Sequence, residues 1–384
     1  MKIAALGHYP IAEPLHGGQR RVAAIAQQAQ QAGHEFHFIP IFSTTSYPDA
    51  SEEERTTALP ESILAELHNS GFREDVHMAR VLGVDHPLVE TVLKRLRALK
   101  PDIVQFEQPW LYPLFETALA QDPVLRRARL VYSSQNVEAA LIGRPWNEEA
   151  RKLEHALVQK ADLVAAVSTS DAAVFDGWRK AGQRPVVVAP NGCWAPDLSE
   201  DNEPERVVAG DYALVAGSAH PPNATGYWDC IGPIPGFLPP GTHLVIAGGM
   251  NQLLVNDDRH RRFPMLNQEF VLNIGQVSET TLTSLLNFAK VICLPITEGG
   301  GTNLKTAEAL MWLKPVIAMR PAMRGFEGAE ALSGVFVADD SRQFRALLRD
   351  AMTGQLVSDR RAEDVARYGW PAQLAPLMDG YVTL

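Results

Sequence analysis

Short β-branched or apolar runs alternate with amphipathic helical stretches along this chain, in two separate series. The alternation is typical of parallel sheets covered on both faces by helices, so we predict an α/β fold. In the first series, strands are predicted at 2–6, 35–41, 102–106, 129–133, 163–167 and 185–189. Helices are predicted at 20–32, 87–99, 148–161 and 170–181. Residues 43–83 are expected to form an insertion with its own helix.

A second series follows a segment at 193–211 that contains Pro196, Pro204 and an acidic run, the composition of a linker. Its predicted strands are at 212–216, 243–247, 271–274, 291–294 and 315–318, and its predicted helices are at 278–288, 302–311 and 341–352. We therefore expect two Rossmann-like domains, at 1–192 and 212–367, facing across a cleft. Ligands in such sheets bind beyond the carboxyl ends of the strands.

Composition narrows the classes of function. The 384 residues include 35 basic and 45 acidic side chains, a formal net charge of −10, so no overall positive field favours nucleic acid. The three cysteines lie far apart without CxxC spacing, which indicates neither a zinc site nor a disulfide framework. The start of the chain lacks the pattern of a signal peptide, and the charge-free stretch at 230–256 is too rich in proline to span a membrane. A cytoplasmic location is expected.

The most informative stretch runs from a predicted strand at 291–294 through Gly299, Gly300 and Gly301 into a predicted helix start, with Lys305 in its first turn. Free backbone amides, the helix dipole and a lysine together favour an anion. The spacing is neither GxxxxGK[ST] nor GxGxxG, so a P-loop ATPase or a dinucleotide-binding fold is not supported. The sequence predicts a phosphate site, the alternative being a glycine-rich turn beside a surface lysine.

This stretch, GGGTNLKTAEAL, resembles the donor-binding signature of the GT-B retaining glycosyltransferases of family 4, in its GGGTxLKxxEA form. Further stretches agree in order along the chain: His16-Gly17-Gly18, Gln135-Asn136-Val137-Glu138, Pro190-Asn191-Gly192 and Pro221-Pro222-Asn223. The resemblance implies a GT-B fold whose last segment, 368–384, crosses back to the N-terminal domain. It also implies sugar transfer from a nucleotide-diphosphate sugar.

On the donor side, the resemblance implies that Lys305 and nearby backbone amides bind the diphosphate and that Glu308 binds the ribose hydroxyls. A carboxylate accepts from both vicinal hydroxyls at once. Lys305, Glu308 and Gln135 are the expected catalytic residues. The expected nucleotide-binding residues are Gly17, Gly18, Gln276, Val277, Gly300, Gly301, Thr302, Asn303, Lys305 and Glu308. Gly17 and Gly18 would admit the phosphates without a Cβ clash, or would merely start a helix.

Three positions depart from the family pattern. Gln135 stands where many members have a histidine, and Gly300 where they have a glutamate. The stretch after the strand at 212–216 lacks the basic pair of other members, since it reads Ser218-Ala219-His220-Pro221-Pro222-Asn223. We therefore expect Lys305 to carry most of the phosphate-binding charge.

On the acceptor side, the expected residues are Glu107, Trp110, Asn136 and Glu138, which follow predicted strands of the first series. A carboxylate beside an indole offers hydrogen bonds and a flat apolar face to a sugar ring. Trp110 could equally be a core aromatic.

Carboxylate pairs such as Asp257-Asp258 lie in polar loops rather than after a donor-binding strand, so we expect no catalytic metal and no cofactor beyond a UDP- or GDP-type donor. The expected partners are a nucleotide sugar and a glycan or glycolipid acceptor of bacterial surface assembly, with peripheral contact at the inner membrane face. Two alternatives stay open: a sugar-nucleotide epimerase or hydrolase on the same fold, and a noncatalytic nucleotide-sugar-binding subunit.

Overall fold

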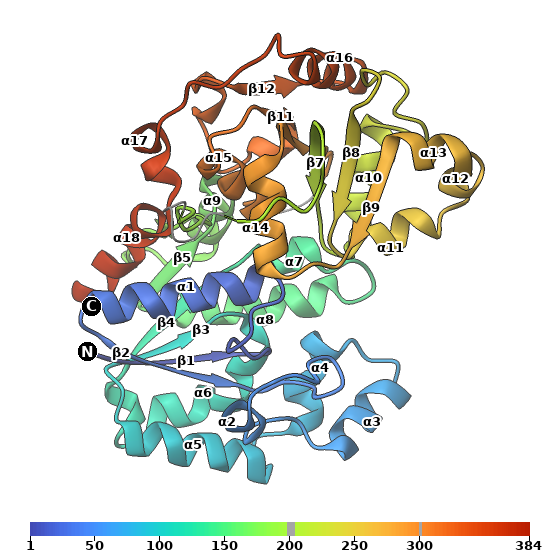
Figure 1. The fold of residues 1–384 in the computed structure, drawn as a ribbon. Helices are drawn as coiled ribbons and strands as arrows, with labels where there is room; N and C mark the ends of the chain where they lie inside the picture. Colours follow the sequence, from blue (N-terminus) through green and yellow to red (C-terminus); the bar gives the residue numbers. More distant parts are fainter. Residues whose placement is uncertain (198–203, 299–301) are drawn as a thin grey trace. The chain divides into compact units, whose positions relative to one another are not determined.

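The computed structural model describes residues 1–197, 204–298 and 302–384. Contacts divide the chain into two compact units. The first comprises Met1–Pro190 with Gln373–Leu384, and the second comprises Asn191–Ala372. Each unit holds a six-stranded sheet of described strands covered by helices (Figure 1). The predicted α/β class is confirmed, and each unit is described by itself below.

The sheet of the first unit is parallel throughout, with the strand order β2-β1-β3-β4-β5-β6. Its strands are β1 (Lys2–Gly7), β2 (Glu35–Pro40), β3 (Ile103–Phe106), β4 (Arg129–Ser133), β5 (Leu163–Ala166) and β6 (Val187–Val188). Every residue of β3 and β5 is buried, as expected of central parallel strands with helices on both faces. The predicted strands agree to within one or two residues, except that β6 is much shorter than predicted.

The helices of the first unit are α1 (Gly17–Gln31), α2 (Glu52–Arg55), α3 (Glu61–Asn69), α4 (Glu74–Leu82), α5 (Pro87–Leu99), α6 (Tyr112–Gln121), α7 (Glu138–Leu141), α8 (Asn147–Lys160) and α9 (Thr169–Trp178). A capping box begins α1, because His16 Nδ1 accepts from the Gln19 amide and the Gln19 side chain accepts from the His16 amide. The insertion predicted with one helix contains three. Helix α6 was not predicted, because its apolar residues do not form a clear stripe.

The second unit also has a parallel sheet, with the order β12-β11-β10-β7-β8-β9. Its strands are β7 (Tyr212–Ala216), β8 (His243–Ala247), β9 (Val271–Gly275), β10 (Val291–Leu294), β11 (Val316–Met319) and β12 (Val335–Ala338). The first five agree closely with the prediction. Strand β12 was missed, since four residues at a sheet edge give little periodicity to detect.

The helices of the second unit are α10 (Pro221–Cys230), α11 (Met250–Val255), α12 (Asp258–Arg261), α13 (Pro264–Phe270), α14 (Glu279–Phe288), α15 (Leu304–Met311), α16 (Ser341–Met352) and α17 (Ala362–Val365). Helix α16 has the predicted bounds, and α15 begins two residues later than predicted. None of the helices in the described part of the chain combines the length and apolar character needed to cross a bilayer.

The last helix, α18 (Trp370–Val382), ends within the first unit, as the GT-B resemblance implied. Leu374, Leu377 and Tyr381 are fully buried there, and Tyr381 Oη donates to Gln105 Oε1 over 2.5 Å. Gly380 packs so closely that a Cβ would lie 2.7 Å from a methyl carbon of Leu163 in β5. The C-terminal segment is therefore part of the core of the first unit.

Candidate functional site

A small pocket in the second unit lies where β7, β10 and the start of α15 meet. The residues that line it are Val215, Ala216, Asn223, Met250, Cys293, Leu294, Pro295, Ile296 and Lys305. They include the last residues of β7 and β10 and the first turns of α10, α11 and α15. The pocket is therefore at the carboxyl edge of the sheet, where ligands of parallel sheets bind.

Glycines allow the loops around this pocket to approach each other closely. A Cβ on Gly217, after β7, would lie 2.5 Å from Met250 Sδ and 3.3 Å from Lys305 Nζ. Gly248, after β8, has a φ of +90° and packs directly against the Gly217 backbone. Gly226 of α10 packs against the carbonyl oxygen of Pro295, with no room for a Cβ. A side chain at Gly248 or Gly226 would collide with backbone atoms, whereas one at Gly217 would displace the Met250 side chain.

Lys305 supplies the cation of this pocket. Its Nζ donates to Asn223 Oδ1 over 2.6 Å. Burial lowers the pKa of Lys305 to about 8, and the negative charge of Glu308 opposes that shift. The ammonium therefore stays largely protonated at pH 7 and has donors left for a ligand, because an ammonium has three.

Thr302 and Asn303, which were expected at the nucleotide, lie directly before α15. Thr302 Oγ1 accepts from the Asn191 backbone amide over 3.1 Å, and the Thr302 carbonyl accepts from Asn191 Nδ2 over 3.0 Å. Asn303 precedes the helix without capping it through its side chain. Glu308 lies one turn beyond Lys305 on the same helix and is partly buried. The expected sites at Gly300 and Gly301 fall outside the described residues.

His220 is a second titratable group near Lys305. It occupies the N-cap position of α10. Burial and the charge of Lys305 lower the pKa of His220, while Glu298 opposes the shift. His220 was not among the predicted site residues. Its place three residues before Asn223 in the segment after β7 was the available signal.

Gln276 and Val277, expected at the nucleotide base, follow β9 directly. Gln276 is exposed, and Val277 is partly buried against an apolar cluster of the second unit. The Gly248 amide donates to the Gly275 carbonyl over 2.6 Å and joins the ends of β8 and β9. Both residues thus lie at the same sheet edge as the Lys305 pocket, and their contact with a base stays a prediction.

In the first unit, Gln135 and Tyr9 meet at the carboxyl ends of β4 and β1. Gln135 Nε2 donates to Tyr9 Oη, which also accepts from Gln108 Nε2 over 2.7 Å. A Cβ on Gly18 would lie 2.5 Å from Gln135 Oε1 and 2.7 Å from Tyr9 Oη. A side chain at Gly18 would therefore displace Gln135 or Tyr9 from these positions, while Gly17 is the first residue of α1. Their roles toward a donor stay predictions.

Glu107 lies beneath this cluster and is fully buried. Its Oε1 accepts from Gln105 Nε2 over 2.5 Å. Burial raises the pKa of Glu107 to about 7, although the Gln105 hydrogen bond and the charge of Arg21 favour the ionised form. The acceptor contact expected of Glu107 is not supported in this conformation, because its carboxylate has no exposed surface.

Trp110 is likewise a core residue. Its side chain is 1% exposed and packs in an apolar cluster with Val76, Ile142 and Ala150. The expected stacking face for a sugar is covered, so the core alternative describes Trp110 in this structure. The burial of Trp110 could not be decided from the sequence, because it depends on α4 and α8 packing over the loop after β3.

Glu138 and Asn136 follow β4. Glu138 is 7% exposed, and burial beside the carboxylate of Glu154 raises the pKa of Glu138 to about 8. Glu154 accepts from Tyr132 Oη over 2.7 Å and from the Glu138 amide over 3.0 Å. Glu154 was not predicted as a functional residue, although it lies on the buried stripe of α8. It anchors the start of α7, and acceptor contacts of Asn136 and Glu138 stay predictions.

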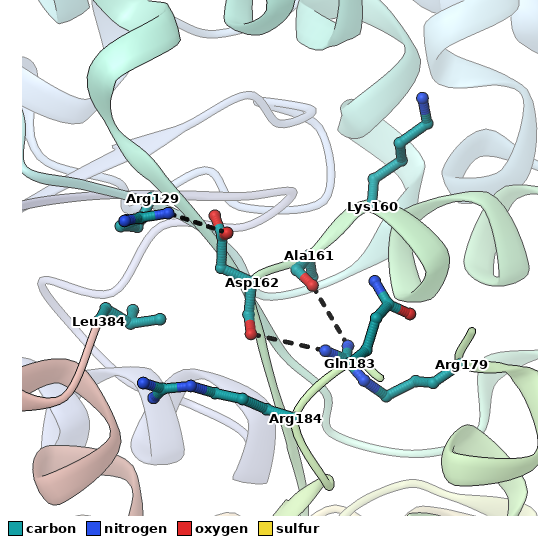
Figure 2. A pocket seen from close by; sticks show the side chains of 8 residues that line it. All are labelled: Arg129, Lys160, Ala161, Asp162, Arg179, Gln183, Arg184 and Leu384. Carbon is teal, nitrogen blue, oxygen red and sulfur yellow. Dashed lines mark hydrogen bonds and ion pairs between the residues drawn. The ribbon is translucent and has the colours of Figure 1, made fainter. Parts of the chain in front are cut away.

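A larger hollow of about 300 Å³ lies in the first unit (Figure 2). Its lining residues are Arg129, Lys160, Ala161, Asp162, Arg179, Gln183, Arg184 and Leu384. Arg129 pairs with Asp162 over 3.4 Å, and Arg179 Nη1 donates to the carbonyl oxygens of Val158 and Ala161. Because Arg129 begins β4 and Asp162 precedes β5, this hollow is at the amino edge of the sheet. The Lys305 pocket, at a carboxyl edge, is therefore the better candidate for a ligand site.

No three His, Cys, Asp or Glu side chains group as metal ligands within residues 1–197, 204–298 and 302–384. The Lys305 ammonium and the Asn223 amide line the pocket, and the Glu308 carboxylate and the His220 imidazole interact electrostatically with Lys305 from nearby. Such a set suits a phosphate next to a polyhydroxylated group.

Comparison with known proteins also indicates a fold that binds nucleotide sugars in other proteins. The profile of Glycosyltransferase Family 4 matches residues 15–193. Among solved structures, Anabaena HepE in complex with UDP has a TM-score of 0.66 at 14% identity, covering 100% of each chain. Sucrose-phosphate synthase from Thermosynechococcus elongatus has a TM-score of 0.65 at 16% identity, covering 100% of this chain and 98% of that chain. The fold is GT-B.

The likeness also extends to the lipopolysaccharide outer core galactosyltransferase WaaB, with a TM-score of 0.59 at 12% identity, covering 100% of this chain and 99% of that chain. HepE has further been solved with UDP-glucose, at a TM-score of 0.64 and 15% identity over 100% of both chains. No curated protein sequence matches the chain. The matched profile and these GT-B folds together support a glycosyltransferase.

Proposed function

We propose that this GT-B protein is a retaining glycosyltransferase that moves a sugar from a nucleotide-diphosphate sugar to a hydroxyl group of a glycan or glycolipid. The observation that carries the proposal is the Lys305 ammonium at the carboxyl edge of the second sheet, 2.6 Å from Asn223 and one helical turn from Glu308. HepE, which shares the fold, binds UDP and UDP-glucose, which favours a UDP-type donor.

In this proposal, Lys305 binds the diphosphate and Glu308 binds the ribose hydroxyls. The bond between the anomeric carbon and the phosphate oxygen breaks as the acceptor oxygen attacks the same face of the sugar. Lys305 stabilises the charge that develops on the leaving diphosphate. The hydroxyl proton passes to a leaving phosphate oxygen, so the chain needs no covalent nucleophile.

The acceptor class is proposed by analogy with a protein of the same fold. WaaB acts in the lipopolysaccharide outer core, and we extend to this chain a role in bacterial surface polysaccharide or glycolipid assembly. We also propose a cytoplasmic location, with peripheral contact at the inner membrane face. Partition of the native protein between cytosol and inner-membrane vesicles tests that location.

Calorimetric titration of two variants tests the donor site. Lys305→Ala is expected to weaken UDP or GDP binding by about tenfold to a hundredfold and nucleoside binding far less, because only the diphosphate contacts the ammonium. Glu308→Gln is expected to weaken nucleoside and nucleoside diphosphate alike, because both carry the ribose. If both variants keep their fold and bind nucleoside diphosphate like the parent, the phosphate site is misplaced.

Product analysis separates transfer from the alternatives. With donor alone, a transferase releases sugar slowly or not at all, whereas an epimerase or hydrolase converts the donor without acceptor. Transfer to an acceptor panel supports the proposal. Donor binding without any turnover would favour a noncatalytic subunit.

A further inference from the structure

A neutral side chain holds the cation of the pocket. Lys305 Nζ donates to Asn223 Oδ1, and the two residues are 82 positions apart in the sequence. A neutral acceptor occupies one of the three ammonium donors without cancelling the charge, whereas a carboxylate would cancel it. We propose that Asn223 is a positioning residue that fixes the Lys305 ammonium for a nucleoside diphosphate and leaves its charge for the phosphates. The inference rests on the proposed function.

Asn223 is itself fixed in orientation. Its Nδ2 donates to the Ser218 carbonyl over 2.9 Å, so its Oδ1 faces Lys305. Its backbone amide donates to the His220 carbonyl over 2.9 Å. Pro221 and Pro222 have no N–H groups, so the start of α10 has few amides left for an anion. The attraction for phosphate on this side of the pocket therefore depends on Lys305.

Within the described part of the chain, Glu308, on the same helix, is the charged group that favours the protonated form of Lys305, and the other neighbours are neutral. His220, on the α10 side, has a lowered pKa and is neutral above pH 7, and Glu298 opposes that shift. Cys293, at the end of β10, has a pKa raised by burial and stays a thiol. Asn223 thus sets the position of Lys305 without adding a charge.

The first experiment needs no ligand. Pulsed acetylation across a pH series, read by mass spectrometry of the peptide containing Lys305, reports the pKa of that amine. Asn223→Asp is expected to raise the midpoint by about one pH unit or more, because it places an opposite charge within contact distance. Asn273→Asp, an exposed substitution in β9, is the matched control and is expected to leave the midpoint unchanged.

The second experiment measures UDP and GDP affinity at pH 7. Asn223→Ala is expected to weaken binding about tenfold, because the ammonium loses its fixed position. Asn223→Asp is also expected to weaken binding, because its carboxylate competes with the phosphates. Asn223→Ala combined with Lys305→Ala is expected to bind like Lys305→Ala alone, since residues that act through one contact are not additive. Asn273→Ala is expected to match the parent.

The outcomes separate the two proposals. The inference is overturned if the acetylation midpoint of Lys305 is the same in Asn223→Asp as in the parent. It is also overturned if Asn223→Ala lowers nucleoside diphosphate affinity by the same factor in the parent and in Lys305→Ala. If Lys305→Ala weakens binding while Asn223→Ala does not, the inference alone fails. If Lys305→Ala binds like the parent, the proposed function fails and the inference fails with it. Circular dichroism of each variant checks that the fold is intact.

Discussion

The stability of the first unit is expected to fall as pH rises, and Glu138→Gln should reduce that fall. Glu138 is 7% exposed and lies beside Glu154. Its pKa of about 8 in the folded chain exceeds the ordinary value of 4.5. Between these two values the folded chain holds a proton that the unfolded chain has released. The free energy of unfolding therefore decreases with rising pH, by about 1.4 kcal/mol per pH unit for this group.

The two pKa values are separated by about 3.5 pH units, which corresponds to at most about 5 kcal/mol by pH 8. Glutamine has no proton to lose, so this contribution disappears in the variant. We compare the free energy of unfolding of Glu138→Gln with that of the parent at each pH. The difference, variant minus parent, is expected to grow from pH 5 to pH 8 and to level off above pH 8. Glu107, whose pKa is raised to about 7, acts in both proteins and cancels in the difference. The repulsion between Glu138 and Glu154 is part of the Glu138 contribution that the variant removes.

Urea unfolding at pH 5, 6, 7 and 8, read by pulsed hydrogen exchange of peptides from the first unit, measures this difference. Glu66→Gln, an exposed substitution in α3 of the same unit, is the matched control and is expected to give a flat difference. A flat difference for Glu138→Gln, or a loss of its stability relative to the parent as pH rises, would refute the reasoning.

Three further predictions follow from the packing and the chemistry. Gly226→Ala is expected to displace α10 from Pro295 and to weaken nucleoside diphosphate binding as well as stability, measured by calorimetry and thermal melts; a parent-like variant would contradict the close packing. Trp110→Ala is expected to destabilise the first unit by about 3–5 kcal/mol, with Trp110→Phe costing less, because the indole fills an apolar cluster; a loss of acceptor use without loss of stability would return Trp110 to the acceptor site. Sugar transfer is expected to persist in EDTA, because Lys305 supplies the charge opposite the diphosphate; activity lost in EDTA and restored by Mn²⁺ or Mg²⁺ would contradict this.

The sequence predicted the parts of the fold that local pattern determines. Apolar runs such as β7 and β8 and the strong amphipathic stripe of α16 were located to the residue. Helix α10 was missed, because two prolines and Gly226 interrupt its pattern. Proline suits the first turn of a helix, and the helix-weakening Gly226 is accounted for by its close packing on the Pro295 carbonyl just after β10.

Within the candidate site, a residue whose role follows from its own segment could be predicted from the sequence. A contact between residues far apart in the sequence could not. Lys305 was expected from the glycine-rich stretch alone, but its partner Asn223 became visible only through a contact across 82 positions. The burial of Glu107 and Trp110 depends on neighbours from other elements, so acid and aromatic residues that were expected to face an acceptor are instead in the core.

The course of α18 affects how this protein can be recombined with its relatives. Tyr381 completes the hydrogen bonding of Gln105, and Gly380 packs on Leu163, so the first unit is encoded by two separate stretches of the gene. A chimera with a single junction at Pro190 would combine residues 1–190 of one protein with the α18 of another. Exchange of the second unit between relatives therefore requires a second junction near Ala372, so that each first unit keeps the α18 residues that pack in its core.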